Sequence, residues 1–187
     1  ASPLPGALAS PLAALYARVA RARRARASSR ARRLRAPVVS VGALAAGGSG
    51  KTPVAAHVAG LLRDAGERPV ILSRGYARAV HEDGVVVVSD GERLRADLAR
   101  SGDEPLLLAR SLPGVAVLVC PDRYLSGCLA ESRLGCTVHV LDDGFQHHAM
   151  ARDVDLVIVS AQDLGEGRVL PAGTPLRTLV PGASEPA

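Results

Sequence analysis

The sequence predicts an α/β domain with a mostly parallel sheet and helices on both faces, preceded by a basic amphipathic helix. Short runs rich in Val, Ile and Leu alternate with helix-like stretches, as in strand–helix–strand units. The chain is 48% hydrophobic but only 2% aromatic, so its core is aliphatic, as in buried parallel strands. A length of 187 residues is enough for one well-filled domain.

The N-terminal segment, residues 1–36, is expected to lie on an anionic membrane surface. Its apolar residues follow the spacing of one helix face at Leu12, Leu15, Tyr16 and Val19. Nine arginines follow between positions 18 and 35, and no acid precedes Asp64. An apolar face joined to an arginine-rich stretch is typical of a helix on a membrane. A basic helix packed on its own domain is the alternative. Nucleic-acid binding is disfavoured because no aromatic residues are interleaved for base stacking.

Residues 37–178 are expected to form the main domain. The expected strands are short apolar or β-branched runs at 37–44, 68–76, 85–89, 115–120, 137–144 and 153–160. The expected helices cover 53–65, 104–112 and 122–134, with Pro53 in the first turn of one and Asp122 as a cap of another. The run at 85–89 follows a turn and is expected at a sheet edge. Residues 179–187 are expected to be a frayed end.

Three classes of protein are disfavoured by composition. The cysteines at 120, 128 and 136 form no CxxC pair and no metal spacing with histidine, which predicts buried free thiols in a reducing compartment. No apolar run approaches the roughly 20 residues that a membrane span needs. The basic stretch follows the apolar one, the reverse of the order in a signal peptide.

A phosphate-binding loop is predicted between the first strand and the first helix. Its residues are Ala45, Ala46, Gly47, Gly48, Ser49, Gly50, Lys51 and Thr52. Backbone N–H groups of such a loop and the following helix N-terminus converge on phosphates, with Lys51 on the β- and γ-phosphates and Thr52 on Mg²⁺. Lys51 is the only lysine beside 22 arginines, as expected where a guanidinium cannot replace an ammonium. The domain is therefore expected to be P-loop NTPase-like and to bind ATP and Mg²⁺. A Gly-rich turn with a chance Gly-Lys-Thr is the alternative.

Two acidic clusters are candidates for metal binding and catalysis. Asp142 and Asp143 end the strand at 137–144, where P-loop proteins place an acid for Mg²⁺. Adjacent carboxylates repel each other, so a nearby cation keeps both ionised. Asp103 and Glu104 open a helix after a glycine. The alternatives are an Asp-Gly turn without metal for the first pair and simple helix capping for the second.

Five stretches in fixed order resemble the tetraacyldisaccharide 4'-kinases, the lipid A kinases of Gram-negative bacteria. They are VVSVGALAAGGSGKTP (38–53), LSRGYA (72–77), SGDEPLLLAR (101–110), LDDGFQHHAMARDVDLVIV (141–159) and GEGRVLPAGTPLR (165–177). The resemblance implies an ATP- and Mg²⁺-dependent phosphotransferase acting on the 4'-hydroxyl of a tetraacyldisaccharide 1-phosphate, a lipid-linked glucosamine disaccharide. It also implies a location on the cytoplasmic face of the bacterial inner membrane, with the N-terminal helix touching anionic lipid.

The resemblance gives each candidate residue an implied role. It places Lys51 and Thr52 at the family's phosphate-loop positions. It implies that Asp103 is the general base and that the metal-proximal acids are Glu104, Asp142 and Asp143. It implies substrate or nucleotide positioning for Arg74, Tyr76, Gln146 and His147.

The chain departs from the family pattern at several places. Ala43 stands where the family usually has Asn, Ala45 replaces the usual first Gly of the loop, and the last motif carries an extra Thr174 and ends in Arg177-Thr178. We expect the chain to be C-terminally truncated, without the second α/β half that supplies a histidine partner for the base.

Two other functions stay open. A membrane-associated P-loop ATPase switch without a small-molecule acceptor is one, but such switches carry an extra lysine at the start of the loop, where this chain has Ala45. A non-catalytic nucleotide- or nucleic-acid-binding module is the other. We expect no nucleic acid and infer no obligate protein partner.

Overall fold

The computed structural model describes residues 31–43, 50–76, 78–80, 83–144 and 149–158. These residues belong to one compact unit, Ala31–Ile158. The predicted basic helix, most of the predicted phosphate loop and the predicted end at 179–187 lie outside the described residues. Among the residues that are described, no helix is both long and apolar enough to cross a membrane.

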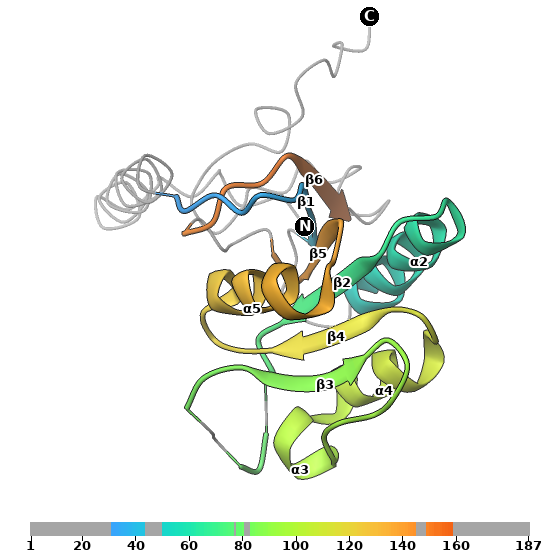
Figure 1. Cartoon of the computed structure of the whole chain (residues 1–187), viewed down its shortest axis with the longest axis vertical. Helices are drawn as coiled ribbons and strands as arrows, with labels where there is room; N and C mark the ends of the chain where they lie inside the picture. The colour runs from blue at the N-terminus through green and yellow to red at the C-terminus, as the bar shows by residue number, and fades with distance from the viewer. Residues whose placement is uncertain (1–30, 44–49, 77, 81–82, 145–148, 159–187) are drawn as a thin grey trace, which may run out of the picture. The chain divides into compact units, whose positions relative to one another are not determined.

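Six strands form a single sheet, in the order β3-β4-β2-β5-β1-β6 (Figure 1). Their bounds are β1 Val38–Ala43, β2 Pro69–Ser73, β3 Val86–Asp90, β4 Ala116–Val119, β5 Val138–Asp142 and β6 Val154–Ile158. Only the β3–β4 pair is antiparallel, and the other four pairs are parallel. The predictions of a mostly parallel sheet and of an edge strand near residues 85–89 are therefore confirmed.

The helices largely follow the predicted positions. They are α2 Lys51–Asp64, α3 Leu98–Ser101, α4 Asp103–Ser111 and α5 Arg123–Leu129, with a π-helical continuation at Ala130–Leu134. Asp122 caps α5 as predicted, because its carboxylate accepts a hydrogen bond from the Tyr124 N–H at 3.1 Å. The short α3 was not predicted, since four residues are too few to show a helical period.

The core has two layers, one on each face of the sheet. Ile71 on β2 packs with buried residues of α2 and α4, whereas its neighbours Val70 and Leu72 pack on the α5 side. Successive strand residues point to opposite faces, so a strand buried on both faces must be apolar throughout. The predicted placement of helices on both faces is confirmed, with α5 opposite α2 and α4 (Figure 1).

Residues 31–36, which the sequence pattern joins to the N-terminal segment, contact the main domain. Arg32 forms a parallel bridge with Met150, and its N–H donates to the Ala149 carbonyl at 3.0 Å. Leu34 is buried against α5, where a Cβ on Gly127 would come within 2.2 Å of its Cδ1. The compact unit therefore begins at Ala31 rather than at residue 37.

All three cysteines are free thiols, as predicted. Only Cys120, at the end of β4, is buried, whereas Cys128 and Cys136 are half-buried. The prediction that all three are buried is wrong for those two, because they lie on the outer layer formed by α5 and its π-helical continuation.

Candidate functional site

The candidate residues meet at one edge of the sheet. Strands β1, β2, β4 and β5 are parallel, so their carboxyl ends share that edge. Helix α4 leads into β4 through a four-residue connection, which places the N-terminus of α4 at the same edge. The edge therefore carries Lys51, Thr52, Arg74, Tyr76, Asp103, Glu104, Asp142 and Asp143. In open α/β sheets this is where ligands bind.

Lys51 begins α2 immediately after a left-handed residue, Gly50, whose φ is 71°. The first turn of this 14-residue helix contains no acid, and no side chain caps it. Its first N–H groups and its dipole therefore favour an anion. The Lys51 side chain is mostly buried, and its Nζ lies 3.7 Å from Asp143 Oδ1. This geometry joins the end of the predicted phosphate loop to the acidic pair.

Asp142 is the most constrained acid of the site. It is 3% exposed, and its Oδ1 is buried with no hydrogen-bond partner among the described residues. Burial raises the pKa of its carboxyl to about 6, and the charges of Glu104 and Asp143 raise it further, against Lys51 and Arg123. The three acids therefore lie within electrostatic reach of one another. A buried carboxylate with an open oxygen is costly unless a cation meets it.

The acid cluster fits a cation that brings other ligands with it. Within the described ranges, no three His, Cys, Asp or Glu side chains lie close enough together to hold a metal ion by themselves. Mg²⁺ in nucleotide sites commonly takes one or two carboxylates and completes its shell with phosphates and water. The open Oδ1 of Asp142 supplies one hard oxygen ligand of that type.

Asp143 follows in an unusual backbone conformation, with φ at 54°. Asp tolerates this left-handed region better than most residues do. The next residue, Gly144, donates its N–H to the Val41 carbonyl of β1 at 3.0 Å, and its own carbonyl accepts from Arg152 Nη1 at 3.1 Å. These bonds fix the turn that carries the acidic pair.

Asp103 is the first residue of α4 and stands on a tight turn. Gly102 before it has φ 84° and ψ 166°, and a Cβ there would lie 3.1 Å from the Tyr76 carbonyl oxygen. A glycine at this position is needed for both reasons. Asp103 borders a hollow of about 530 Å³ that is lined by Ala79, Asp97, Leu98, Ala99, Gly102 and Asp103. The carboxylate can therefore meet a molecule entering from solvent.

The remaining predicted residues are placed unequally. Arg74 is exposed and close enough to Arg123 to affect its pKa, so it belongs to the site region. Tyr76 is 85% exposed and lies on the surface beside the Gly102 turn. The predicted contacts from Gln146 and His147, and from residues 45–49 of the loop, lie outside the described residues.

Arg123 is a candidate site residue that the sequence reading missed. It opens α5 but is only 1% exposed. Burial lowers its pKa, as does the charge of Arg74, whereas Asp143 and Asp142 oppose the change. Its guanidinium therefore lies near the acidic pair. An arginine in the first turn opposes the helix dipole, and this is the signal that sequence analysis could have used.

Arg78 is a second buried arginine that the sequence reading did not select. It is 5% exposed, and its Nε and Nη1 have no hydrogen-bond partner among the described residues. Gly75 has φ at 69°, and a Cβ there would meet Arg78 Nε at 2.8 Å. The glycine of the Ser-Arg-Gly-Tyr stretch thus makes room for this side chain.

Comparisons with known proteins agree with this arrangement. Residues 6–185 match the model of the tetraacyldisaccharide-1-P 4'-kinase family. A tetraacyldisaccharide 4'-kinase from Geobacter metallireducens is 46% identical over 145 residues, which are 77% of this chain and 43% of that protein. One from Anaeromyxobacter dehalogenans strain 2CP-C is 51% identical over 144 residues, covering 76% of this chain and 38% of the relative.

A solved structure is also similar. It is a crystal structure of LpxK from Aquifex aeolicus in complex with ATP, with a TM-score of 0.75 and 39% identity. The match covers 90% of this chain and 53% of that one. The chain thus spans about half the length, or less, of the relatives that it matches.

Proposed function

This chain belongs to the tetraacyldisaccharide-1-P 4'-kinase family, and from that premise we propose that the whole protein phosphorylates a lipid A precursor. The γ-phosphoryl group of ATP would pass to the 4'-hydroxyl of a tetraacyldisaccharide 1-phosphate. The observation that supports this best is the convergence of Lys51, the acids around Asp142 and the separate acid Asp103 at one sheet edge. A phosphoryl transfer needs these three kinds of group together.

The N-terminus of α2 is the proposed phosphate-binding element. Lys51 would neutralise the β- and γ-phosphates, while the unoccupied first-turn N–H groups of α2 donate to phosphate oxygens. The ion pair with Asp143, at 3.7 Å, is long enough to be exchanged for a phosphate contact. The Aquifex relative, crystallised with ATP, supports a nucleotide at this position.

The acids of the β5 edge are the proposed metal site. Mg²⁺ bound there would neutralise charge on the phosphate oxygens during transfer. Asp142 would supply its open Oδ1, with Thr52, Glu104 and Asp143 nearby in the first or an outer shell. The ionised form of Asp142 is unfavourable without a cation, so the site is arranged to take one.

Asp103 is the proposed general base. It would accept the proton of the 4'-hydroxyl as that oxygen forms its bond to the γ-phosphorus, and ADP would leave with the bridging oxygen. The hollow beside it is bordered by Ala79, Leu98 and Ala99, which offer apolar contact to a lipid acceptor. Arg74, Tyr76, Arg78 and Arg123, with Gln146 and His147, are proposed to position the two substrates.

The proposed location is the cytoplasmic face of the inner membrane. Residues 1–30 carry six of the nine arginines between positions 18 and 35, beside an apolar helical stripe. Such a segment binds anionic lipid through both terms. A lipid-linked acceptor is presented at that same surface.

The test is phosphorylation of a purified tetraacyldisaccharide 1-phosphate by the whole protein, followed by mass spectrometry. Gain of one phosphate at the 4' position is expected. Hydrolysis of ATP without transfer to the lipid would instead favour a membrane-associated ATPase switch, which the P-loop alone also permits.

The same assay tests the division of roles between two aspartates. Asp103→Asn should lower kcat by about 10²-fold or more while MgATP affinity changes little, because it removes only the proton acceptor. Asp142→Asn should raise the Mg²⁺ concentration needed for half-maximal rate. If Asp103→Asn mainly weakened MgATP binding and kept its turnover, the two roles would have to be exchanged.

A further inference from the structure

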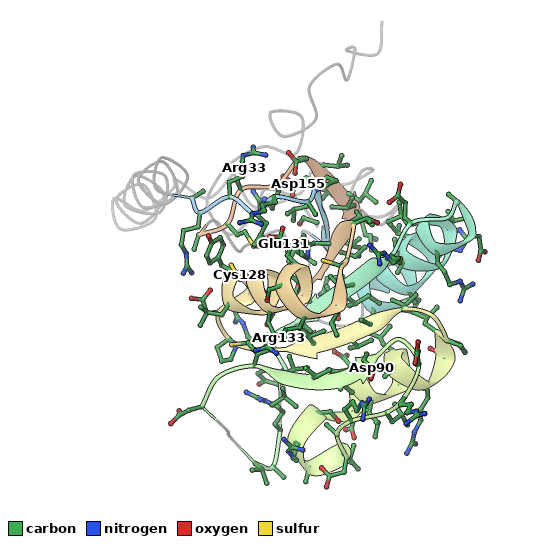
Figure 2. The ribbon with its side chains drawn as sticks, viewed as in Figure 1. Arg33, Asp90, Cys128, Glu131, Arg133 and Asp155 are labelled. Atoms are coloured by element: carbon green, nitrogen blue, oxygen red, sulfur yellow. The ribbon has the colours of Figure 1, made fainter. Side chains whose placement is uncertain are left out.

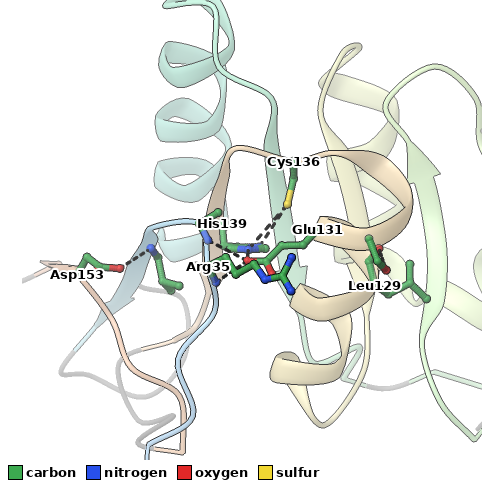
Figure 3. A network of polar contacts seen from close by, with 9 residues as sticks. Arg35, Leu129, Glu131, Cys136, His139 and Asp153 are labelled. Carbon is green, nitrogen blue, oxygen red and sulfur yellow. Dashed lines mark hydrogen bonds and ion pairs between the residues drawn. The ribbon is translucent and has the colours of Figure 1, made fainter.

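Three carboxylates hold the segment 31–38 onto the domain. Asp122 binds Arg32, and Asp153 accepts from both Arg33 Nη1 at 2.7 Å and the Val38 N–H at 2.8 Å. Glu131 accepts from the N–H groups that follow, those of residues 35 and 36, at 2.8 and 2.9 Å. Figure 3 shows the Glu131 and Asp153 contacts on neighbouring elements. The chain entering β1 is therefore held by specific bonds.

The segment leaves space beneath it on the α5 side. Arg33, Cys128 and Glu131, which are labelled in Figure 2, line a common hollow of about 280 Å³. The attachment there depends on individual polar contacts and on Leu34 more than on continuous packing. Loss of a single contact can therefore change how α5 is held.

The Arg32 contact differs from the other two because it reaches α5 itself. Arg32 Nη2 lies 2.6 and 2.7 Å from the two oxygens of Asp122, which is the N-cap of α5. The Arg32 guanidinium also lies 4.4 Å from the centre of the Tyr124 ring. The hydrogen bond from Arg32 is the main cause of the lowered pKa of Asp122. One side chain thus contacts the residues on both sides of Arg123.

Arg123 lies between those two residues and reaches toward the acidic pair. It is 1% exposed, and the charges of Asp143 and Asp142 act on its guanidinium. Any tilt of the first turn of α5 must move this side chain, because a buried arginine has no free space in which to compensate. The position of α5 therefore determines the position of a cation in the candidate site.

We propose that Arg32 is a positioning residue of the phosphoryl-transfer site. By holding Asp122 and Tyr124 it fixes the first turn of α5, and thereby the place of Arg123 beside the acidic pair. The inference rests on the proposed function, since it concerns the same site. It also ties residues 1–30 to that site, because Arg32 follows them directly in the chain.

The neighbouring Arg33 provides a matched control. It forms an ion pair of the same kind, 2.7 Å from Asp153, and both members are about as exposed as the Arg32 pair. Asp153 precedes β6, the strand at the far edge from β3, and does not cap α5. Arg33→Gln and Arg32→Gln therefore remove the same charge and the same type of bond from adjacent positions.

The experiment measures the dissociation constant for MgATP in the whole protein by titration calorimetry. Arg32→Gln is expected to weaken binding by about 3- to 10-fold, because a displaced Arg123 attracts the net negative MgATP less well. Arg33→Gln should stay within about 2-fold. Both variants should lose similar thermal stability, so stability alone cannot produce the difference. Equal MgATP affinities for the two variants would overturn the proposal.

Two double-variant comparisons test the route. Asp122→Asn keeps a capping oxygen but loses the ion pair, so it should match Arg32→Gln, and the two changes together should weaken binding no further. In an Arg123→Gln background, Arg32→Gln should have no additional effect, and Arg123→Lys serves if that background does not fold. An Arg32 effect that persists without Arg123 contradicts the route.

The two proposals can fail separately. If the whole protein binds MgATP but transfers no phosphate to the lipid disaccharide, the proposed function fails and the affinity comparison still tests Arg32. If the lipid is phosphorylated while Arg32→Gln behaves like Arg33→Gln, only the positioning role fails.

Discussion

Replacing Asp142 with Asn should stabilise the fold while impairing the site. The pKa of this carboxyl rises from 3.8 to about 6, which corresponds to roughly 3 kcal/mol of unfavourable free energy for the ionised form at pH 7. Asn removes the charge at nearly constant volume. Because its amide is also buried without full hydrogen bonding, we expect a net gain of about 1–3 kcal/mol in the free energy of unfolding.

The sign of the pH dependence follows from the raised pKa. The folded state binds the Asp142 proton more tightly than the unfolded state, so this group's contribution is fully present below pH 3.8 and is lost as the pH rises through about 6. The gain from Asp142→Asn should therefore be largest near pH 7 and should shrink toward pH 5. His139, whose pKa is lowered by burial, has the opposite effect in this window. It is common to both proteins, so the difference between them isolates Asp142.

The assay is urea unfolding of the 187-residue chain in EDTA at pH 5, 6 and 7. Asp143→Asn is the control, because its side chain is 66% exposed and should change stability little. Mg²⁺ together with ATP should stabilise the parent chain and have less effect on Asp142→Asn. Equal or lower stability of Asp142→Asn at pH 7 would refute the view that this carboxylate is held at a cost for a cation.

Two further predictions concern the ends of the proposed machinery. Lys51→Ala should abolish phosphoryl transfer in the whole protein with the fold retained, because a charge-assisted phosphate contact contributes several kcal/mol, or about 10²-fold in rate; turnover near that of the parent would defeat the assignment. Deletion of residues 1–30, which spares Arg32 and Arg33, should release the protein from anionic vesicles, since each arginine contributes about 1 kcal/mol near such a surface. High salt should mimic the deletion and neutral vesicles should bind neither form; unchanged binding of the shortened protein would show that another part is the anchor.

The sequence was sufficient for features that depend on neighbours along the chain. Aliphatic runs such as Val115–Cys120 announce buried strands, because both faces of such a strand must be apolar. Pro53 and Gly66 mark the first turn and the end region of α2, and Asp122 marks the start of α5. The acids at Asp142 could be paired with the phosphate loop because strand ends in parallel sheets share an edge.

Features that depend on distant parts of the chain could not be read in this way. The order of the strands places β5 between β1 and β2, although it follows both by more than sixty residues. That order alone brings Asp143 to Lys51. Residues 31–36 look like a continuation of the basic segment, yet partners near positions 122, 131 and 153 bind them to the domain. Charge alone does not reveal which arginines face solvent and which face an acid.

The site stands out in the structure where local preferences are broken. Arg123 opens a helix whose dipole opposes it, Asp143 adopts a left-handed backbone, and Asp142 and Arg78 bury open polar atoms. Each of these features weakens the fold by itself, and a protein retains such features mainly where they serve a site. An arginine, two aspartates and a phosphate-loop lysine at one edge offset one another only partly, as the raised pKa of Asp142 shows. The remaining imbalance is removed when a cation and an anionic phosphate chain enter together, which is the reason why MgATP fits this edge better than either component alone.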